Sequence, residues 1–362
     1  MSRTSCLIPG LLLLALAPLG SGGLAGQSGP AKGGFVVRLG QDTLAVERYT
    51  RSAGRLESDI VLRTPNARRV HYVASLAPAG TVSRFELTME PLVAANGTRS
   101  RGVMIFRNDS ADVTVTLGDS TRHLKVAVKP GAVPLAALSH AVVEQAILQA
   151  RKAKQDSLPF DWLALDAGQA MPSYVTTRGK DSVVLQFFSR PAYARVDRSG
   201  RLLWLDGRET TMKVEVTRDD DVDLEKFAQA FTRDETAGGP MGQLSPRDTT
   251  RAEVGGAHLL VDYGRPHKRG REIFGGLVPW DQVWRTGANS ATQLTTDQDL
   301  TMGGQKVPAG TYTLWTLPAR EGAKLIINQQ TRQWGTDYDP ARDLVRVDLR
   351  RESLASPVEQ FT

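Results

Sequence analysis

Apolar and polar residues alternate with a period of two along most of this chain, which is typical of β-strands with one buried face. Such segments recur after short breaks from Phe35 to Lys129, and similar ones resume between residues 173 and 218. The breaks contain Gly, Asn or Pro, the residues of tight turns. This spacing predicts a mainly β protein. We expect its N-terminal domain, residues 35–231, to be an antiparallel curved sheet or half-barrel.

One segment in this region has a helical period instead. From Pro134 to Lys154 apolar residues recur at spacings of three and four, with Leu138, Val142 and Ala146 on one stripe. Proline at the start and Arg or Lys in the last turn are typical of helix ends. We expect one helix over residues 134–154, packed on one face of the sheet. A second, short helix is expected over residues 223–231.

The rest of the chain is again built from short strands and turns. Residues 232–249 are rich in Gly, Pro and polar residues without periodicity, which is typical of a linker. Residues 250–362 show only short strands separated by tight turns, which predicts a C-terminal β-sandwich or jelly-roll-like domain. Strand alternation has just begun at residues 358–362, so we expect this domain to be clipped at its C-terminus.

The N-terminus has the pattern of a secretory signal peptide. Arg3 precedes an apolar run of 13 residues, 7–19, and Gly23-Leu24-Ala25 is a small-x-small cleavage site. The run is shorter than the ~20 residues that span a bilayer as a helix. We therefore expect a signal peptide over residues 1–25 and an exported protein, periplasmic or extracellular. The mature chain should have no transmembrane span; an uncleaved anchor is the alternative.

Cysteine content and charge narrow the possible classes of protein. Cys6 is the only cysteine and lies in the expected signal peptide, so the mature chain can form no disulfide and no thiolate metal site. The formal net charge is +6, but the basic residues are scattered. A nucleic-acid surface would require basic residues clustered with interleaved aromatic residues. We expect no nucleic-acid partner.

The densest run of special residue types is 257–289. Arg265, His267 and Arg271 follow a strand there and could bind an anion, because Arg pairs bidentately with oxyanions and His can change its charge. A turn with solvated charges is the alternative. Trp284, Arg285 and Asn289, with Trp280, could line a sugar or peptide site. Alternatively, Trp284 belongs to the core and Arg285 to a buried ion pair.

A second candidate group lies at residues 337–339. Asp337 and Asp339 flank Tyr338 and could provide the paired carboxylates of glycoside hydrolysis, although residues two apart in a turn more often cap a loop. We include Asp337 and Tyr338 among the candidate ligand-binding residues. The five histidines form no HExxH or similar ligand pair, and no nucleophile elbow or nucleotide fingerprint is present. We predict no catalytic residues, metal site or cofactor, and favour a non-catalytic protein over an enzyme.

Four motifs carry a family resemblance. They are DYGRPHKRGREIFGGLVPWDQVWRTGANSATQLT (262–295), KVPAGTYTLWTLP (306–318), KLIINQQTRQWGTDYDPARDLVRV (324–347) and PVEQFT (357–362). In this order they resemble the secreted bacterial domain-of-unknown-function 2911 family over roughly residues 250–362. The resemblance implies an exported all-β domain, usually longer than this one, and no particular reaction. Family members often carry Glu where this chain has Ser290, which weakens an acid/base role there.

Three functional hypotheses remain. The first is a non-catalytic extracytoplasmic ligand-binding or envelope-associated protein, whose ligand is a glycan, a peptide or an envelope component. The second is a hydrolase with an unrecognised active site in the C-terminal domain, using Asp337 or His267. The third is a carrier of lipophilic ligands through the N-terminal half-barrel, which rests on analogy alone.

Overall fold

In the computed structural model the described residues are 29–187 and 190–362. The expected signal peptide, residues 1–25, lies outside them. The protein is mainly β, as predicted, and its strands fall into one large N-terminal sheet and separate C-terminal sheets. Neither helix of the described ranges has the length and apolar character that a bilayer crossing requires.

The N-terminal sheet has 15 strands in the order β8-β7-β6-β5-β4-β3-β2-β1-β15-β14-β13-β12-β11-β10-β9. Neighbours are antiparallel except β9 and β10, which are parallel. The end strands β8 and β9 are not neighbours, so the curved sheet is open and forms no closed barrel. The strands are β1 (Ala31–Leu39), β2 (Asp42–Arg51), β3 (Arg55–Leu62), β4 (Arg68–Leu76), β5 (Val82–Pro91), β6 (Ser100–Phe106), β7 (Ser110–Leu117), β8 (Ser120–Ala127), β9 (Val133–Leu135), β10 (Ser157–Ala164), β11 (Met171–Arg178), β12 (Ser182–Phe187), β13 (Arg190–Val196), β14 (Leu202–Asp206) and β15 (Glu215–Arg218).

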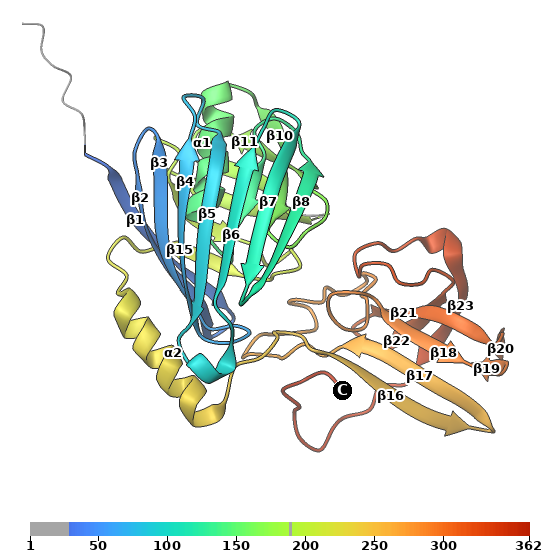
Figure 1. The fold of residues 1–362 in the computed structure, drawn as a ribbon. Coiled ribbons are helices and arrows are strands. Elements are labelled where there is room, and N and C mark those ends of the chain that lie inside the picture. The colour runs from blue at the N-terminus through green and yellow to red at the C-terminus, as the bar shows by residue number, and fades with distance from the viewer. Residues whose placement is uncertain (1–28, 188–189) are drawn as a thin grey trace, which may run out of the picture.

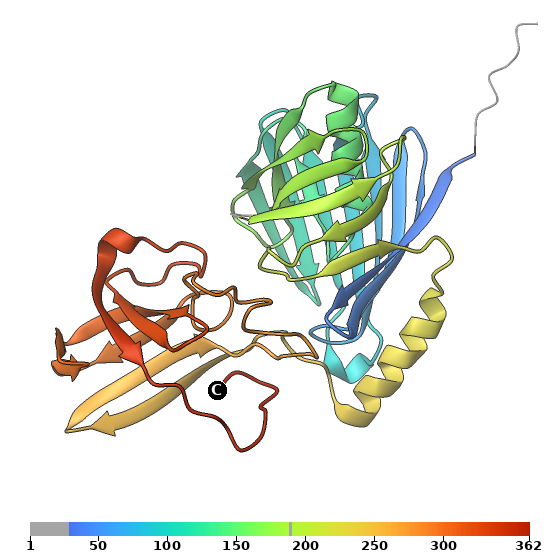
Figure 2. The same cartoon turned by 180° about the vertical axis from the view of Figure 1, so that it is seen from behind.

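Helix α1 (Ala141–Ala153) lies inside the curve of this sheet (Figures 1 and 2). Nine of its 13 residues are buried, including Glu144, Gln145 and Gln149. The helix is therefore enclosed on most of its circumference. The helix packs on one face of the sheet, as predicted, and this is the concave face because the sheet bends around it.

The start of this helix differs from the prediction. Val133–Leu135 forms strand β9, which pairs with β10, and α1 begins seven residues after Pro134. The connection contains Ala137 and Leu138 with φ of 25° and 63°, values that no α-helix contains. Periodicity alone did not reveal this boundary, because the apolar residues before Ala141 are buried by strand pairing.

Helix α2 (Leu224–Gly238) packs on the outer face of the curved sheet. Its Leu224, Ala228 and Phe231 contact the outward-facing Val36, Val46 and Val61 of β1, β2 and β3. Asp223 caps its N-terminus, as its carboxylate accepts a hydrogen bond from the amide of Lys226 at 3.1 Å. The helix runs seven residues beyond Phe231, so residues 232–238 of the expected linker are helical.

The C-terminal part contains a six-stranded antiparallel sheet and a two-stranded ribbon. The sheet order is β16-β17-β18-β21-β22-β23, and the ribbon pairs β19 with β20. The ribbon's Leu300, Met302 and Val307 pack with Tyr312 and Ile327 of the sheet, which makes a small two-layer arrangement. The strands are β16 (Arg247–Val254), β17 (Ala257–Gly264), β18 (Thr292–Thr296), β19 (Leu300–Met302), β20 (Gln305–Val307), β21 (Gly310–Pro318), β22 (Ala323–Asn328) and β23 (Asp343–Leu349); two 3₁₀ turns, η1 (Ala94–Asn96) and η2 (Pro340–Arg342), complete the elements.

The two parts touch through the turn between β1 and β2. The amide of Gln41 donates to the carbonyl of Arg269 at 3.4 Å, and the Arg269 guanidinium pairs with Asp42. Gly40 has φ of 60°, and a Cβ there would lie 2.4 Å from the backbone carbonyl oxygen of Arg269. A glycine is therefore required at this close approach. The C-terminal part lies beside one open end of the curved sheet (Figure 1).

Candidate functional site

Along the strands of the curved sheet, the inward-facing side chains change from buried to exposed. On β7 the inward side chains Val113, Val115 and Leu117 go from 1% exposed, through half-buried, to 56% exposed. On β5, Leu87 is buried and Met89 is half-buried. The apolar interior is thus filled near α1 and reaches solvent at the other end. We call this end the apolar mouth.

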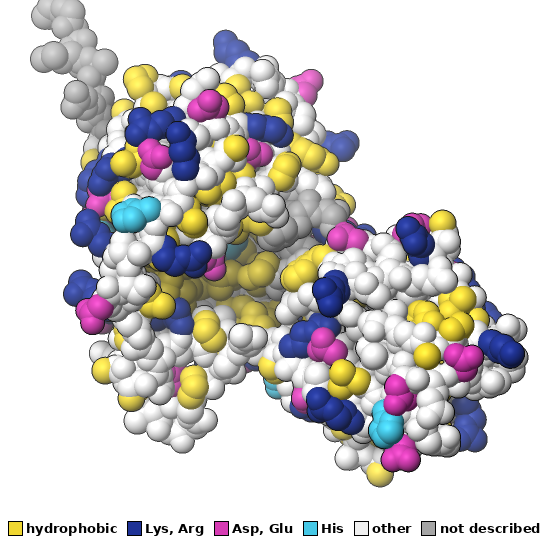
Figure 3. All heavy atoms as spheres, turned by 45° about the vertical axis from the view of Figure 1, so that its right-hand side comes forward, with side chains coloured by type: hydrophobic (Ala, Val, Ile, Leu, Met, Phe, Trp, Pro, Cys, Tyr) yellow, Lys and Arg dark blue, Asp and Glu magenta, His cyan; other side chains and the backbone are white. Residues whose placement is uncertain are grey.

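Strand register shows that these residues share one end of the sheet. Pro91 of β5 lies opposite Arg68 of β4, which lies opposite Leu62 of β3. Leu62 lies opposite Ala45, close to the β1–β2 turn that touches the C-terminal part. The apolar mouth therefore opens toward the C-terminal part. Figure 3 shows a hollow with hydrophobic side chains between the two parts.

Loops complete the lining of the apolar mouth. Leu165, after β10, packs against Gly102 of β6, where a Cβ would lie 2.4 Å from its side chain. A larger residue at position 102 would force the Leu165 side chain to move. Half-buried apolar side chains from the loops at residues 135–138 and 165–171 and from the linker pack on the same core; they are Leu135, Ala137, Leu138, Leu165, Ala170, Met171, Met241 and Leu244.

A cavity of about 240 Å³ lies at the edge of the apolar mouth. Met89 and Leu117 provide its apolar walls, and Asn66 and Arg68 provide its polar side. One Arg68 nitrogen lies 2.9 Å from the sulfur of Met89. Burial lowers the pKa of Arg68. This edge can accept a polar group beside an apolar one.

Two buried glutamates hold α1 above the mouth. The Glu47 carboxylate accepts hydrogen bonds from the amides of His140 and Ala141 at 2.6 and 3.1 Å, at the helix N-terminus. Ser139 also donates to it, at 2.6 Å. Burial raises the pKa of Glu47. Anions are stabilised at a helix N-terminus by the free amides and the helix dipole, which explains a glutamate in this position.

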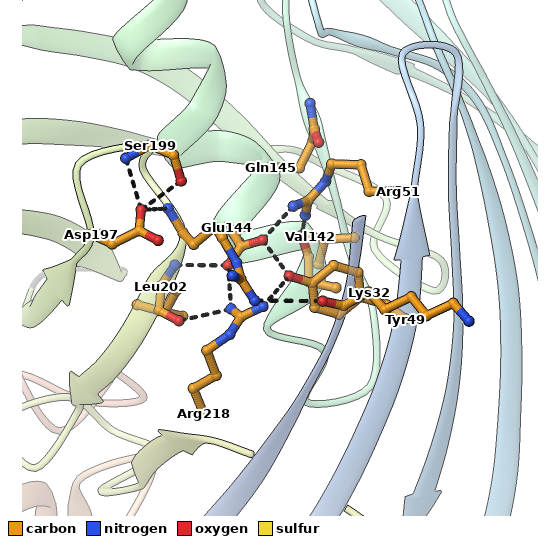
Figure 4. A network of polar contacts seen from close by, with 12 residues as sticks. Lys32, Tyr49, Arg51, Val142, Glu144, Gln145, Asp197, Ser199, Leu202 and Arg218 are labelled. Carbon is orange, nitrogen blue, oxygen red and sulfur yellow. Dashed lines mark hydrogen bonds and ion pairs between the residues drawn. The ribbon is translucent and has the colours of Figure 1, made fainter. Parts of the chain in front are cut away.

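The second glutamate, Glu144, is fully buried between two arginines (Figure 4). Arg51 pairs with one carboxylate oxygen, and Arg218 donates to the other at 2.9 Å. The Tyr49 hydroxyl and the amide of Leu202 donate at 2.6 and 2.7 Å. Burial raises the pKa of Tyr49 to about 12. With all its acceptor positions in use, Glu144 ties the helix to three strands and has no free site for a ligand.

The predicted anion loop fastens residues 359–361 to the fold. Arg265 pairs with Asp248 at 2.8 Å and donates to the carbonyl of Phe361 at 3.0 Å. His267 bridges Gln360 through the backbone, and Arg271 donates to the His267 carbonyl at 2.7 Å. The charges at 265 and 271 are thus used within the loop. The Nδ1 atom of His267 is buried without a hydrogen-bond partner among the described residues.

The predicted aromatic wall exists only in part. Trp284 lies edge-on to Phe274 and Phe361, with ring centroids 6.1 and 5.6 Å apart. Trp280 stacks on Phe274 at 5.9 Å, and Phe274 is 47% exposed. Trp284 is half-buried and so is neither an open stacking platform nor a core anchor. Arg285 points away from this aromatic row, toward Gly335.

Arg285 and Asn289 meet at Gly335. A Cβ on Gly335 would lie 1.9 Å from Cδ of Arg285 and 2.5 Å from the carbonyl oxygen of Asn289. Asn289 has φ of 62°, and its carbonyl accepts a hydrogen bond from the Gly335 amide at 3.0 Å. The suggestion that Arg285 forms a buried ion pair is wrong within the described residues, where no carboxylate pairs with it.

Residues 337–339 do not form a catalytic pair. Asp337 is exposed, and Asp339 caps the η2 turn by accepting a hydrogen bond from the amide of Ala341 at 2.9 Å. Tyr338 packs on Trp315, with centroids 5.0 Å apart, and donates to Asp343 at 2.7 Å. Burial raises the pKa of Tyr338 to about 12. Among the eight predicted residues, Arg285 and Asn289 meet at Gly335, and Arg265 and His267 lie together against residues 360–361.

Sequence reasoning did not single out Lys213, which lies in the loop between β14 and β15. It is half-buried at φ of 57°, and the positive charges of Arg285, Arg190 and Arg271 act on it. No sequence signal links a lysine at 213 to an arginine at 285, because only the contact between the two parts brings them together.

Across residues 29–187 and 190–362, no group of His, Cys, Asp and Glu is arranged to hold a metal ion.

Comparison with known proteins agrees with the resemblance noted in the sequence. Residues 245–362 match DUF2911, a protein family of unknown function. The C-terminal third is thus similar to DUF2911, and we refer to it as the DUF2911 region. No curated protein matches the chain.

Two solved structures of uncharacterised families are distantly similar. One is a DUF1089 family protein from Pseudomonas aeruginosa, with 12% identity and a TM-score of 0.34, covering 45% of this chain and 89% of that chain. The other is a β-barrel-like protein of domain of unknown function DUF1849 from Brucella abortus, with 10% identity and a TM-score of 0.33, covering 52% of this chain and 94% of that chain. Likeness of this degree implies no shared function.

Proposed function

We propose that this protein is an exported, non-catalytic binding protein or carrier whose ligand places an apolar body in the apolar mouth. The observation that carries the proposal is the gradient along the inner face, from Val113 at 1% to Leu117 at 56% exposed. Exposed apolar surface is unfavourable in water, by roughly 25 cal/mol per Å². A concave apolar patch is thus a site where an apolar ligand gains free energy by displacing water.

The site supports a carrier of lipophilic molecules better than the other two hypotheses. The interior under α1 is filled by side chains such as Phe35 and Phe160, so a ligand would enter at the mouth and not beneath the helix. A hydrolase site at Asp337 or His267 has no support, because Asp337 is exposed in a turn and His267 lies in the loop that holds residues 359–361.

A binding assay with an apolar probe tests this proposal. N-phenyl-1-naphthylamine, a neutral fluorophore that brightens in apolar sites, should bind the wild-type protein with saturation. The variant Val115→Asp places a charge in the mouth and should weaken binding at least about tenfold. Val103 is the matched control, since it is similarly half-buried but on the outward face of the neighbouring strand β6.

The control variant Val103→Asp should bind the probe as the wild type does. Binding that is absent in the wild type, or equal in both variants, would contradict the proposal.

Export is tested separately, by mass spectrometry of the protein recovered from cells. We expect an N-terminus near Gly26 in the extracytoplasmic fraction, and a full-length chain in the cytoplasm would count against it.

The aromatic row of the DUF2911 region supports a second candidate function, binding of a glycan. Phe274 and Trp280 stack at 5.9 Å, and Phe274 is largely open to solvent. Sugar rings pack on exposed aromatic faces through their apolar sides. The variant Phe274→Ala should abolish retention on immobilised envelope polysaccharide, and equal retention of Phe274→Ala and wild type would eliminate this function.

A further inference from the structure

Two cations from distant parts of the chain are half-buried together where the DUF2911 region meets the curved sheet. Lys213 comes from the β14–β15 loop and Arg285 from the segment before β18. Within the described ranges, neither side chain donates a hydrogen bond or pairs with a carboxylate. In the described part of the chain, the Nε atom of Arg285 is buried without a hydrogen-bond partner. Buried polar atoms usually have partners, so this arrangement calls for one.

The surrounding charge has one dominant sign. Arg190 and Arg271 add positive charge around Lys213, and Glu209 opposes it. Burial, and then the charge of Arg285 and its neighbours, lowers the pKa of Lys213 to about 8. Burial and Arg190 lower the pKa of Arg285 to about 10. Unpaired, desolvated like charges are unfavourable, and an anion between them would relieve both their repulsion and their lost hydration.

The backbone holds these cations in place. Gly335 allows the Arg285 side chain to lie directly over its Cα, where a Cβ would lie 1.9 Å from Cδ of Arg285. Trp334, the preceding residue, donates from its indole nitrogen to Thr211 at 3.4 Å, two residues before Lys213. This hydrogen bond links the two segments that carry the cations. The site is therefore preorganised by contacts between the two parts of the molecule.

The cations lie at the rim of the apolar mouth. Glu215, two residues after Lys213, lies opposite Arg38 of β1, which is next to the β1–β2 turn. That turn is at the same end of the sheet as Arg68 and Pro91. Figure 3 shows Lys and Arg side chains on both sides of the hollow.

We propose that Lys213 and Arg285 form an oxyanion subsite, which takes the phosphate or carboxylate head of a ligand whose apolar chain occupies the mouth. The subsite rests on the proposed function, since it assigns the ligand class as anionic amphiphiles. Arg is suited to this role because its planar guanidinium binds two oxygens of one oxyanion, while Lys contributes a compact charge.

Calorimetric titration of the full chain with three probes tests the subsite. Dodecyl phosphate and dodecyltrimethylammonium share a chain and differ in head charge; both are used below their micelle concentrations, beside inorganic phosphate. We expect dodecyl phosphate to bind at least about tenfold tighter than dodecyltrimethylammonium. Lys213→Met and Arg285→Met should each weaken dodecyl phosphate at least about tenfold and leave dodecyltrimethylammonium unchanged.

Lys306→Met and Arg251→Met are matched controls, because both side chains are exposed in the C-terminal sheets, and they should bind like wild type. If the two dodecyl probes bind with equal affinity, or if Lys213→Met and Arg285→Met bind dodecyl phosphate like wild type, the subsite is overturned while the proposed function stands. Inorganic phosphate that binds as tightly as dodecyl phosphate shows a free-anion site and overturns the link to the mouth. If neither dodecyl probe binds the wild type, the proposed function itself fails.

Discussion

Buried charges decide how α1 is held. Glu144 neutralises Arg51 and Arg218 inside the sheet and receives hydrogen bonds from Tyr49 and Leu202. A buried ion pair adds little net stability compared with apolar residues, but removing one member leaves the other charge uncompensated. Exposed ion pairs on the outer face of the sheet differ from this cluster, because water can solvate a charge that loses its partner there.

The variant Glu144→Gln should lower the free energy of unfolding by about 3–5 kcal/mol, because two desolvated guanidinium groups lose their counter-charge. Urea unfolding followed by circular dichroism measures the loss. Glu57→Gln is the control: Glu57 pairs with Arg55 at 3.0 Å, but both are exposed. Exposed pairs contribute about 0–1 kcal/mol, so a similar loss in both variants would contradict this explanation.

His140 makes stability depend on pH. Burial lowers its pKa from 6.5 to about 4. Between those values the unfolded chain binds a proton that the folded protein does not, so stability is lost as the pH falls below about 6.5. Each unit of pKa difference corresponds to about 1.4 kcal/mol, which gives a loss of up to about 3 kcal/mol at pH 4.

Replacing His140 isolates this contribution. The variant His140→Gln should flatten the stability profile between pH 6.5 and 4, measured as urea midpoints at a series of pH values. The raised pKa of Glu47 acts in the opposite direction, since its contribution falls as the pH rises above about 4.5, and it stays in both proteins. His123→Gln, at an exposed site on β8, should retain the wild-type slope. An unchanged slope in His140→Gln would refute the assignment.

At the scale of elements, capping decides where α2 begins. Asp223 has extended backbone angles and accepts a hydrogen bond from the Lys226 amide at 3.1 Å. Asp223→Ala should destabilise the protein by about 1 kcal/mol, because an amide of the first turn loses its acceptor. Thermal unfolding measures the change. Asp221→Ala, two residues earlier and exposed, removes the same charge without touching a cap and should have a smaller effect; equal effects would assign the loss to charge alone.

Helices and strands were predicted correctly where the apolar pattern of a segment has a single structural origin. Alternation placed the strands, and β13 and β14 pair antiparallel through the turn at Ser199-Gly200. The start of α1 was wrong because residues before Ala141 are apolar for a different reason, pairing of β9 with β10. The length of α2 was missed because residues 232–238 carry few apolar positions and are helical mainly as a continuation of a well-capped, packed helix.

At the scale of the whole molecule, the contact between the curved sheet and the DUF2911 region depends on one glycine. Gly40→Ala should separate the two parts, because the added Cβ would lie 2.4 Å from the backbone carbonyl oxygen of Arg269. We expect a larger radius of gyration in small-angle X-ray scattering and faster proteolysis between residues 239 and 246. Each part should keep its own fold.

Gly255→Ala is the matched control for this prediction. Gly255 also has a left-handed backbone, with φ of 59°, but has no neighbour within 4 Å of a Cβ. It therefore introduces similar backbone strain without a collision between the two parts. If Gly255→Ala increases the radius of gyration as much as Gly40→Ala, backbone strain and not the contact would be responsible.

Several of the predicted site residues make contacts within the fold. Arg265 and Arg271 bind backbone carbonyls and a carboxylate, and the half-buried Tyr338 packs against the core of the C-terminal sheet. A sequence lists the residue types that can bind a ligand, but the same types stabilise loops. Arg285 remains a candidate because, within the described residues, its buried Nε atom has no hydrogen-bond partner, a fact that depends on every residue around it.

Local pattern was enough for the fold class, the succession of short strands and the resemblance of residues 245–362 to DUF2911. These features depend on period, turn residues and motif order, all of which are local in the chain. The curvature that encloses α1, the apolar mouth and the meeting of Lys213 with Arg285 were decided only in three dimensions. Each depends on contacts between residues tens to hundreds of positions apart, and no periodicity in one segment encodes which distant segment will face it.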